Sequence, residues 1–249
     1  MSPTSPSSEH DSARDDYREH IVKEIAGADG DVGYAVAIGS PSWQEFERIG
    51  QLEVALLTQY GLLDCGLLVD VGCGSGRLAV SLPMSFSGRY VGTDISQPLL
   101  EQASRLVNGP SFRFVHVNGL TIPLEDGSAD MISMFSLLTH LRHEESFLYL
   151  REAVRVLRSG GRIIFSFLDF SQESHWSIFS DTVAAVESRV LHHVNQFMSR
   201  DAVLAWARML NCGVIDIHDG QSRFIRWAQP DGTVSWDSIG QSVAVLEKP

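Results

Sequence analysis

The stretch LLVDVGCGSGRLAVSL, residues 67–82, joins a short apolar run to three glycines spaced two residues apart. Four of its first five residues are apolar, which predicts a buried strand over 67–71. The glycines allow a sharp turn, and the residues after the last glycine predict a helix. A glycine-rich turn between a strand and a helix is typical of phosphate binding, because a helix N-terminus attracts anions. Asp70, the polar residue of the strand, therefore decides whether a phosphate suits this turn.

The charge of Asp70 and the spacing of the glycines argue against a dinucleotide. Dinucleotide-binding turns space their glycines as GxGxxG, whereas Gly72, Gly74 and Gly76 form GxGxG. A carboxylate at this position would repel a pyrophosphate and attract an ammonium group. The residues therefore favour a nucleoside that carries an amino acid end. The alternative is that Asp70 only braces the turn.

Two further predicted strand ends carry side chains suited to a nucleoside. Asp94 lies at the end of a strand over 89–95, where a carboxylate can accept hydrogen bonds from both ribose hydroxyls. Asn118 follows a strand over 111–117, and its amide oxygen could accept a hydrogen bond from an adenine amino group. The next residue, Gly119, could offer its backbone N–H to a ring nitrogen. A plain Asn-Gly turn is the alternative for this pair.

Strands and helices alternate around these motifs. The other predicted core strands span 129–135 and 161–168. One predicted helix starts at Gly76, a second is capped by Ser96, and a third spans 143–157. This βαβ succession predicts a parallel sheet with helices on both faces and right-handed crossovers.

The flanking segments predict further elements around this core. Upstream, we expect helices over 15–27 and from the cap at Ser42 to Gly61, with a glycine-rich connection over 27–41. Downstream, we expect helices near 181–195 and from Ser199 to Asn211, a hairpin around 230–232, and last strands over 213–219 and 241–248. Residues 15–249 are expected to form one domain, in which segments near 15–60 and 171–200 cap the ligand site.

Together these motifs resemble those of class I S-adenosylmethionine-dependent methyltransferases. The resemblance is carried by LLVDVGCGSG, VGTDIS, NGLTIPLEDGSADMISM, SLLTHL and LREAVRVLRSGGRIIF, within roughly residues 65–168, and by the closing IGQSVAVLEKP. It implies an α/β fold with a Rossmann-like, mostly parallel sheet of seven strands, helices on both faces and an antiparallel last strand. It also implies S-adenosylmethionine as the cofactor and methyl transfer as the reaction.

The resemblance also implies how the cofactor is held. Asp70 and the glycine loop would hold the methionine part, Asp94 the ribose, and Asn118 with Gly119 the adenine. Many members of the family have Asp at the position of Asn118, and Asn keeps the acceptor oxygen. The implied cofactor-binding set comprises Asp70, Gly72, Cys73, Gly74, Gly76, Asp94, Ile95, Asn118, Gly119 and Ser136. Of these, Cys73 is also interpreted as a small packing residue rather than a reactive thiol.

The residues after the fourth core strand, 136–143, should face the transferred methyl group, because ligands gather beyond the carboxyl ends of parallel strands. His140 is our first candidate for a general base, since histidine titrates near neutral pH. A packing role is its alternative. His175 is a weaker second candidate. No metal site is predicted, because the adjacent His192 and His193 lack the i, i+4 spacing of a metal-binding pair.

Composition narrows the classes of partner. The chain has 249 residues and a net charge of −12 at pH 7, which argues against a nucleic-acid binder. No apolar run approaches the length of a membrane span, so no membrane contact is expected. Residues 1–14 are rich in Ser, Pro and acids, lack the apolar region of a secretory signal, and predict a disordered tail. Three cysteines without metal or disulfide spacing favour a reduced, cytoplasmic location.

The predicted function is transfer of a methyl group from S-adenosylmethionine to an oxygen or nitrogen of a small organic molecule. Two alternatives stay open. One is a methyltransferase-like partner protein that binds the cofactor without catalysis. The other is an NAD-linked Rossmann oxidoreductase, against which Asp70 and the glycine spacing argue. The residues predict neither the acceptor molecule nor the oligomeric state.

Overall fold

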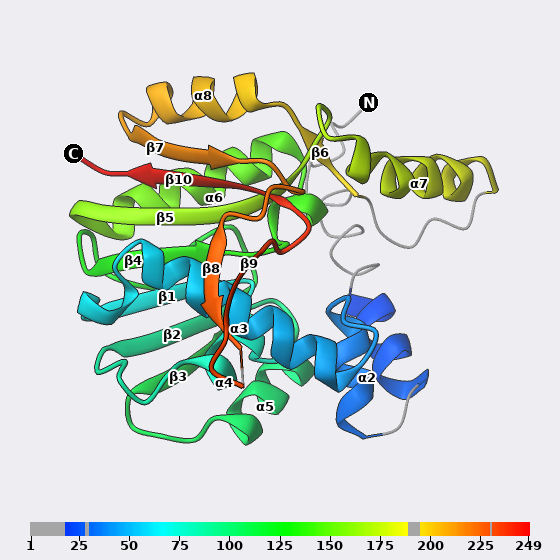
Figure 1. The fold of residues 1–249 in the computed structure, drawn as a ribbon, viewed down its shortest axis with the longest axis horizontal. Helices are drawn as coiled ribbons and strands as arrows, with labels where there is room; N and C mark the ends of the chain where they lie inside the picture. The colour runs from blue at the N-terminus through cyan, green and yellow to red at the C-terminus, as the bar shows by residue number, and fades with distance from the viewer. Residues whose placement is uncertain (1–17, 28–29, 189–194, 230) are drawn as a thin grey trace, which may run out of the picture.

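The computed structural model describes residues 18–27, 30–188, 195–229 and 231–249. The predicted tail at 1–14 and the pair His192 and His193 lie outside these ranges. Within the described ranges, the chain forms a central sheet with helices on both faces (Figure 1).

The central sheet has the predicted topology. Its strands run in the order β3-β2-β1-β4-β5-β10-β7. They are β1 (Leu67–Val71), β2 (Arg89–Asp94), β3 (Phe112–His116), β4 (Ala129–Met134), β5 (Leu157–Asp169), β7 (Gly213–His218) and β10 (Ser242–Glu247). A short strand, β6 (Phe197–Met198), pairs with the end of β5. The β10 strand runs antiparallel between β5 and β7, so the predicted mostly parallel sheet with an antiparallel last strand is confirmed.

Helices cover both faces because β1 alternates its buried side chains between two cores. Leu67, Val69 and Val71 pack with α6 (His143–Val156) and α8 (Arg200–Met209). Leu68 packs on the opposite face with α3 (Trp43–Gln59) and α4 (Arg77–Ser81), beside which lies α5 (Gln97–Leu106). Since side chains of a strand alternate with a period of two, Asp70 faces the same side as Leu68. The carboxylate of the motif therefore points toward the α3 and α4 side of the sheet.

Several elements depart from their predicted bounds. The expected connection over 27–41 contains a helix, α2 (Asp31–Ala37), which buries Ala35 and Ala37. The β5 strand begins at Leu157, directly after α6, because Gly160 takes a positive φ of 72° and pairs its N–H with the carbonyl of Lys248. The helix expected near 181–195 starts earlier, as α7 (Trp176–Ser188).

The end of α8 also differs from its prediction. The helix predicted from Ser199 to Asn211 spans Arg200–Met209; Asn211 follows it with a φ of 54°, and Gly213 opens β7. The predicted hairpin is confirmed as β8 (Ile225–Ala228) and β9 (Val234–Asp237). It packs beside α3, where Arg48 forms an ion pair with Asp237 at 3.0 Å.

The remaining helical segments gather at one end of the sheet. They are the helical residues 18–27, α2, α7 and two short 3₁₀ turns, η2 (Leu138–His140) and η3 (Glu173–His175). A further turn, η1 (Leu62–Asp64), leads into β1. Figure 1 shows α2 and α7 beyond the carboxyl ends of the parallel strands, whereas α3 lies across the sheet. The end of the sheet where ligands are expected is therefore bordered by helices from both flanking segments.

Candidate active site

A cavity of about 450 Å³ opens at the carboxyl ends of β1, β2 and β4, a size typical of small-molecule sites. The predicted cofactor residues that line it are Asp70, Gly72, Cys73, Gly74, Asp94, Ile95, Gly119 and Ser136. Gly76 and Asn118 do not line it. Most of the predicted set thus meets at one cavity, although its members come from four separate strand ends.

Two residues of the glycine loop have a backbone conformation in which a residue with a side chain would be strained. Gly74 has a φ of 53°, and a Cβ on it would lie 2.9 Å from the side chain of Ile38. Gly76 has a φ of 89°, and a Cβ on it would lie 2.9 Å from Ala103 on α5. The loop therefore needs glycine both for its conformation and for its close packing against α2 and α5.

Asp70 is buried in the sheet and held by two hydroxyl groups. Its Oδ2 accepts a hydrogen bond from Tyr90 at 2.7 Å, and its Oδ1 accepts one from Ser133 at 2.9 Å. Ser133 lies directly opposite on β4. Burial raises the pKa of Asp70 to about 7, against the opposing effect of the two hydroxyls. An ammonium group beside this carboxyl would restore its charge, which suits the amino acid end predicted for the ligand.

Asp94 links β2 to the glycine loop. Its Oδ2 accepts from the Gly74 N–H at 2.9 Å and its Oδ1 accepts from the Ser96 N–H at 2.8 Å. Burial raises the pKa of Asp94, and the backbone N–H groups act in the opposite direction. A carboxylate has about four acceptor sites, so two remain for the hydroxyls of a ligand.

The predicted adenine position has an unexpected neighbour. The Oδ1 atom of Asn118 accepts a hydrogen bond from Arg18 at 3.0 Å, and Arg18 also reaches the carbonyl of Ile95 at 3.4 Å. Gly119 lines the cavity, and its carbonyl accepts from Tyr149 at 2.9 Å. The N-terminal helix thus crosses the ends of β2 and β3, a contact for which the sequence gives no local signal.

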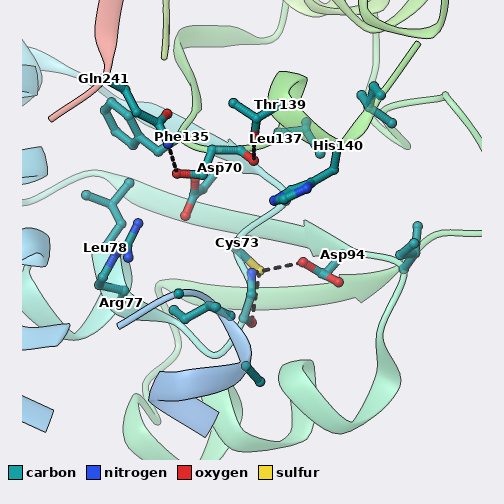
Figure 2. Close-up of a pocket in the computed structure, with 18 of the residues that line it drawn as sticks. Asp70, Cys73, Arg77, Leu78, Asp94, Phe135, Leu137, Thr139, His140 and Gln241 are labelled. Atoms are coloured by element: carbon teal, nitrogen blue, oxygen red, sulfur yellow. Dashed lines mark hydrogen bonds between the residues drawn. The ribbon is translucent and has the colours of Figure 1, made fainter. Parts of the chain in front are cut away.

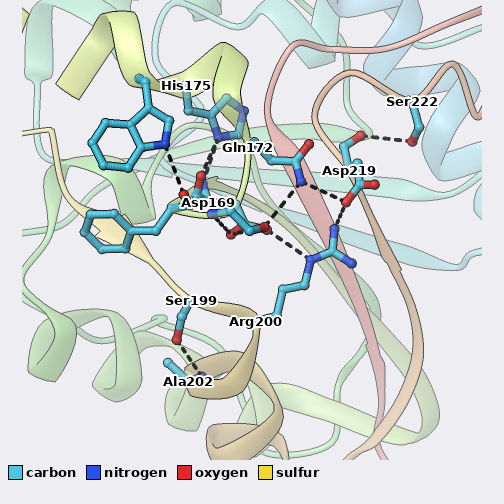
Figure 3. Close-up of polar contacts among 11 residues, drawn as sticks. Asp169, Gln172, His175, Ser199, Arg200, Ala202, Asp219 and Ser222 are labelled. Atoms are coloured by element: carbon cyan, nitrogen blue, oxygen red, sulfur yellow. Dashed lines mark hydrogen bonds and ion pairs between the residues drawn. The ribbon is translucent and has the colours of Figure 1, made fainter. Parts of the chain in front are cut away.

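The two candidate bases have different surroundings. His140 ends η2, lines the cavity, and points its ring into it (Figure 2). His175 does not line the cavity and is 1% exposed. Its Nδ1 accepts from the Asp169 N–H at 2.8 Å (Figure 3). Its Nε2 therefore carries the proton and donates to the carbonyl of Gly240 at 3.1 Å. Both ring nitrogens are engaged, so His175 supports the fold at this point, and its role as a second base stays a prediction.

The surroundings of His175 form a polar cluster beside the cavity. Asp169, at the end of β5, accepts from Arg200 Nε at 3.0 Å, and Arg200 also pairs with Asp219 (Figure 3). Gln172 donates to Asp219 at 3.1 Å. These bonds tie β5, α8 and the loop after β7 together.

A buried ion pair in the cavity was not predicted. Arg77 Nη2 lies 2.6 Å from Glu53 Oε1, and both residues line the cavity with Asp70. Glu53 is 2% exposed; burial raises its pKa, and Arg77 opposes that shift. The Nε atom of Arg77 is buried without a hydrogen-bond partner in the described part of the chain. The signal in the sequence is the position of Glu53, four residues after Ile49 and three before Leu56, on the apolar face of the helix predicted from Ser42 to Gly61.

The surroundings of Cys73 and the arrangement of metal-ligating side chains bear on two other kinds of chemistry at this site. Burial raises the pKa of the Cys73 thiol well above its usual value, as do the nearby charges of Asp94 and Asp70. Cys73 is therefore a packing residue with little thiolate. Within the described ranges, no group of three or more His, Cys, Asp or Glu side chains could hold a metal ion. In the same ranges, no helix combines the length and apolar character needed to cross a membrane.

Comparison with known proteins gives consistent results. The model of a methyltransferase domain family matches residues 69–165, from β1 through most of β5. Malonyl-[acyl-carrier protein] O-methyltransferase of Hahella chejuensis is 30% identical over 152 residues, 59% of this chain and 50% of the relative. Demethylmenaquinone methyltransferase of Lactococcus lactis is 31% identical over 103 residues, 39% of this chain and 40% of the relative. The structure of magnesium protoporphyrin IX methyltransferase from Synechocystis PCC 6803, solved with bound S-adenosylmethionine, has a TM-score of 0.62 at 15% identity and covers 99% of this chain and 100% of its own.

The chain spans half or less of the length of these two curated relatives. The residues that the family model matches, 69–165, contain the glycine loop and the ends of β1, β2 and β4 that border the cavity. Motifs, sheet topology and family match agree: residues 69–165 match a methyltransferase domain, and the chain has the fold of a methyltransferase solved with bound S-adenosylmethionine.

Proposed function

We propose that this protein transfers the methyl group of S-adenosylmethionine to an oxygen or nitrogen of a small organic molecule. The observation that carries the proposal is the convergence of Asp70, the glycine loop and Asp94 on one cavity within a methyltransferase domain. When bound, S-adenosylmethionine supplies an activated methyl group, so the protein has to align the acceptor and handle its proton.

The residues of the cavity fit this cofactor. A methionine end carries an ammonium and a carboxylate, and the cavity holds Asp70 for the first and Arg77 for the second. The unpaired Nε of Arg77 supports this assignment, because a buried guanidinium N–H without a partner is costly. Asp94 would accept from the ribose hydroxyls. The loop residues Gly72, Cys73, Gly74 and Gly76, together with Ile95, Asn118, Gly119 and the backbone of Ser136, complete the proposed cofactor site.

The helical residues 18–27, α2 and α7 are our proposed cap over the ligands. His20, Ala37 and Ile178 come from these three segments and line the cavity, which supports the proposal. A cap of this kind excludes water and aligns the reactants.

Binding of the cofactor can be tested without knowing the acceptor. A ligand that binds the folded state raises the free energy of unfolding by about 2.7 kcal/mol at a concentration of 100 Kd. We expect S-adenosylmethionine and S-adenosylhomocysteine to raise the unfolding temperature, and NAD to leave it unchanged. A shift with NAD alone would overturn the proposal in favour of the oxidoreductase alternative. A panel of phenols and amines, assayed for S-adenosylhomocysteine release, then separates an enzyme from a non-catalytic partner protein.

His140 is the proposed general base if the acceptor is a hydroxyl. His140→Gln should then lower turnover about a hundredfold, because a positioned base contributes about that factor. The affinity for the cofactor should stay the same. We expect the parent to lose activity at acid pH, where His140 is protonated, and the variant to lack this pH dependence. His218→Ala is the control, since that ring stacks on Phe224 and does not line the cavity. A His140→Gln protein with the parent's turnover and pH profile would remove His140 from the mechanism.

A further inference from the structure

A closed ring of hydrogen bonds borders the cavity at the ends of three strands. Ser136 follows β4, Ser166 lies in β5, and Gln241 precedes β10. The Ser136 N–H donates to Ser166 Oγ at 2.8 Å, and Ser166 Oγ donates to Gln241 Oε1 at 2.7 Å. Gln241 Nε2 then donates to Ser136 Oγ at 3.2 Å, which closes the ring.

The order of donors around this ring determines where its remaining hydrogens point. Because Ser136 Oγ accepts from Gln241, its own hydrogen is directed away from the ring. Gln241 Nε2 has a second hydrogen as well. Among the described residues, neither hydrogen has an acceptor, and both Ser136 and Gln241 line the cavity. The ring therefore presents two donors to a ligand.

The backbone of Ser136 supports a role for its side chain. Its φ is 55°, a value that a non-glycine residue adopts at a cost in free energy. Two bonds hold this conformation: the Ser136 N–H to Ser166, and Thr139 Oγ1, which donates to the Ser136 carbonyl at 2.7 Å. Strained positions of this kind cluster at ligand sites, where the strain holds a group ready for its partner.

The rest of the cavity determines what the two donors can bind. Phe135, Leu168, Ile178 and Ile239 contribute apolar side chains to the same cavity, and Phe135 lies beside Gln241 (Figure 2). The carboxylates of the cavity have other partners, and the proposed function assigns the remaining acceptor sites of Asp70 and Asp94 to the cofactor. Asp70 accepts from Tyr90 and Ser133, Asp94 from Gly74 and Ser96, Glu53 from Arg77, and Glu145 from the Arg142 N–H.

We propose that Ser136 and Gln241 bind the reacting oxygen of the methyl acceptor, and that the acceptor is an acidic hydroxyl on an apolar ring, as in a phenol or an enol. This inference rests on the proposed function and narrows it to O-methylation. Two converging donors stabilise an oxygen anion, as in an oxyanion hole, and offer nothing to an ammonium. In the reaction, a lone pair of that oxygen forms the new bond to the methyl carbon. The carbon–sulfur bond breaks with its electron pair left on sulfur, and the proton of the acceptor passes to His140 or to water.

The inference is tested with 4-nitrophenol, whose anion absorbs visible light, so its ionisation can be followed without turnover. The protein is saturated with S-adenosylhomocysteine, and the probe is titrated with pH in its presence. We expect the bound probe to ionise at a pH about one unit lower than the free probe, a preference for the anion of tenfold or more, because hydrogen bonds to charged groups are the strong ones.

Two variants connect this preference to the ring. Gln241→Glu places a negative charge against the probe and should reverse the preference. Ser136→Gly suits the positive φ, removes the hydroxyl alone, and should reduce the preference several-fold. Gln44→Glu, on the exposed first turn of α3 and outside the cavity, adds the same charge and should behave as the parent.

The outcomes separate this inference from the proposed function. If S-adenosylhomocysteine fails to stabilise the parent protein, the proposed function itself fails. If it stabilises the protein but the probe does not bind, or ionises identically in the parent and Gln241→Glu, the inference alone is overturned. Binding of protonated benzylamine in place of the nitrophenolate would also overturn it and point to a nitrogen acceptor.

Discussion

Asp94→Asn is expected to weaken binding of S-adenosylmethionine and S-adenosylhomocysteine by about one to three powers of ten. Each of the two expected hydrogen bonds from ribose hydroxyls to the carboxylate contributes about 1.5–3 kcal/mol. Since about 1.4 kcal/mol corresponds to a tenfold change in Kd, losing the charge and one acceptor oxygen has this consequence. Isothermal titration calorimetry of the folded variant measures the change directly.

The contacts of Asp94 also determine which substitution is informative. Asp94→Ala would leave the buried N–H groups of Gly74 and Ser96 without their partner, at about 1–3 kcal/mol each, and would destabilise the glycine loop itself. Asp94→Asn keeps one acceptor and limits that loss. Asp64→Asn, an exposed residue of η1, is the matched control. A Kd within threefold of the parent in folded Asp94→Asn would rule out the ribose role.

Arg77→Met is expected to lower the free energy of unfolding by about 3–5 kcal/mol, because it leaves Glu53 buried without its partner. Burial already raises the pKa of Glu53, and removing Arg77 raises it further. The folded variant therefore holds the proton to higher pH than the unfolded chain does. Its stability falls as the pH rises above the ordinary pKa of a glutamate, and the loss is smaller in acid. Urea unfolding at acid and neutral pH measures both effects.

A double variant separates stability from binding at this ion pair. Glu53→Leu with Arg77→Met removes both charges and should recover most of the lost stability, since apolar pairs often replace buried ion pairs without loss. It should not recover cofactor affinity if Arg77 holds the methionine carboxylate. Arg113→Met, on the exposed side of β3, controls for loss of a positive charge. A double variant no more stable than Arg77→Met would contradict the coupling, and full recovery of affinity would remove Arg77 from the cofactor site.

The sequence predicts those parts of the site whose residues lie next to one another along the chain. Asp70, the glycine turn and Asp94 each combine a strand with the residue that ends it, and the parallel sheet brings such ends together. Helix α2 was missed because glycines flank and interrupt it, so its propensity is poor. The burial of Ala35 and Ala37 stabilises it instead.

The features of the site that the sequence does not predict come from contacts between distant segments. Gly240, which lies 65 residues after His175, accepts the remaining N–H of the His175 ring. The ion pair between Glu53 and Arg77 joins α3 and α4, which β1 separates along the chain. The periodicity of a sequence does not predict which buried charges form a pair. The positive φ of Ser136 has no counterpart in the sequence, because serine seldom adopts it.

The position of Gln241 has a consequence for how the protein matures during synthesis. Gln241 precedes β10, which inserts between β5 and β7 although it follows both along the chain. Synthesis proceeds from the N-terminus, so the residues of β1 to β7 leave the ribosome before those of β10. The strands that carry Asp70 and Asp94 can therefore pair while β10 is still unmade, whereas the ring with Ser136 and Ser166 closes only once β10 has entered the sheet. In a nascent chain, the strands that border the proposed cofactor site would thus be available before the ring that we propose binds the methyl acceptor.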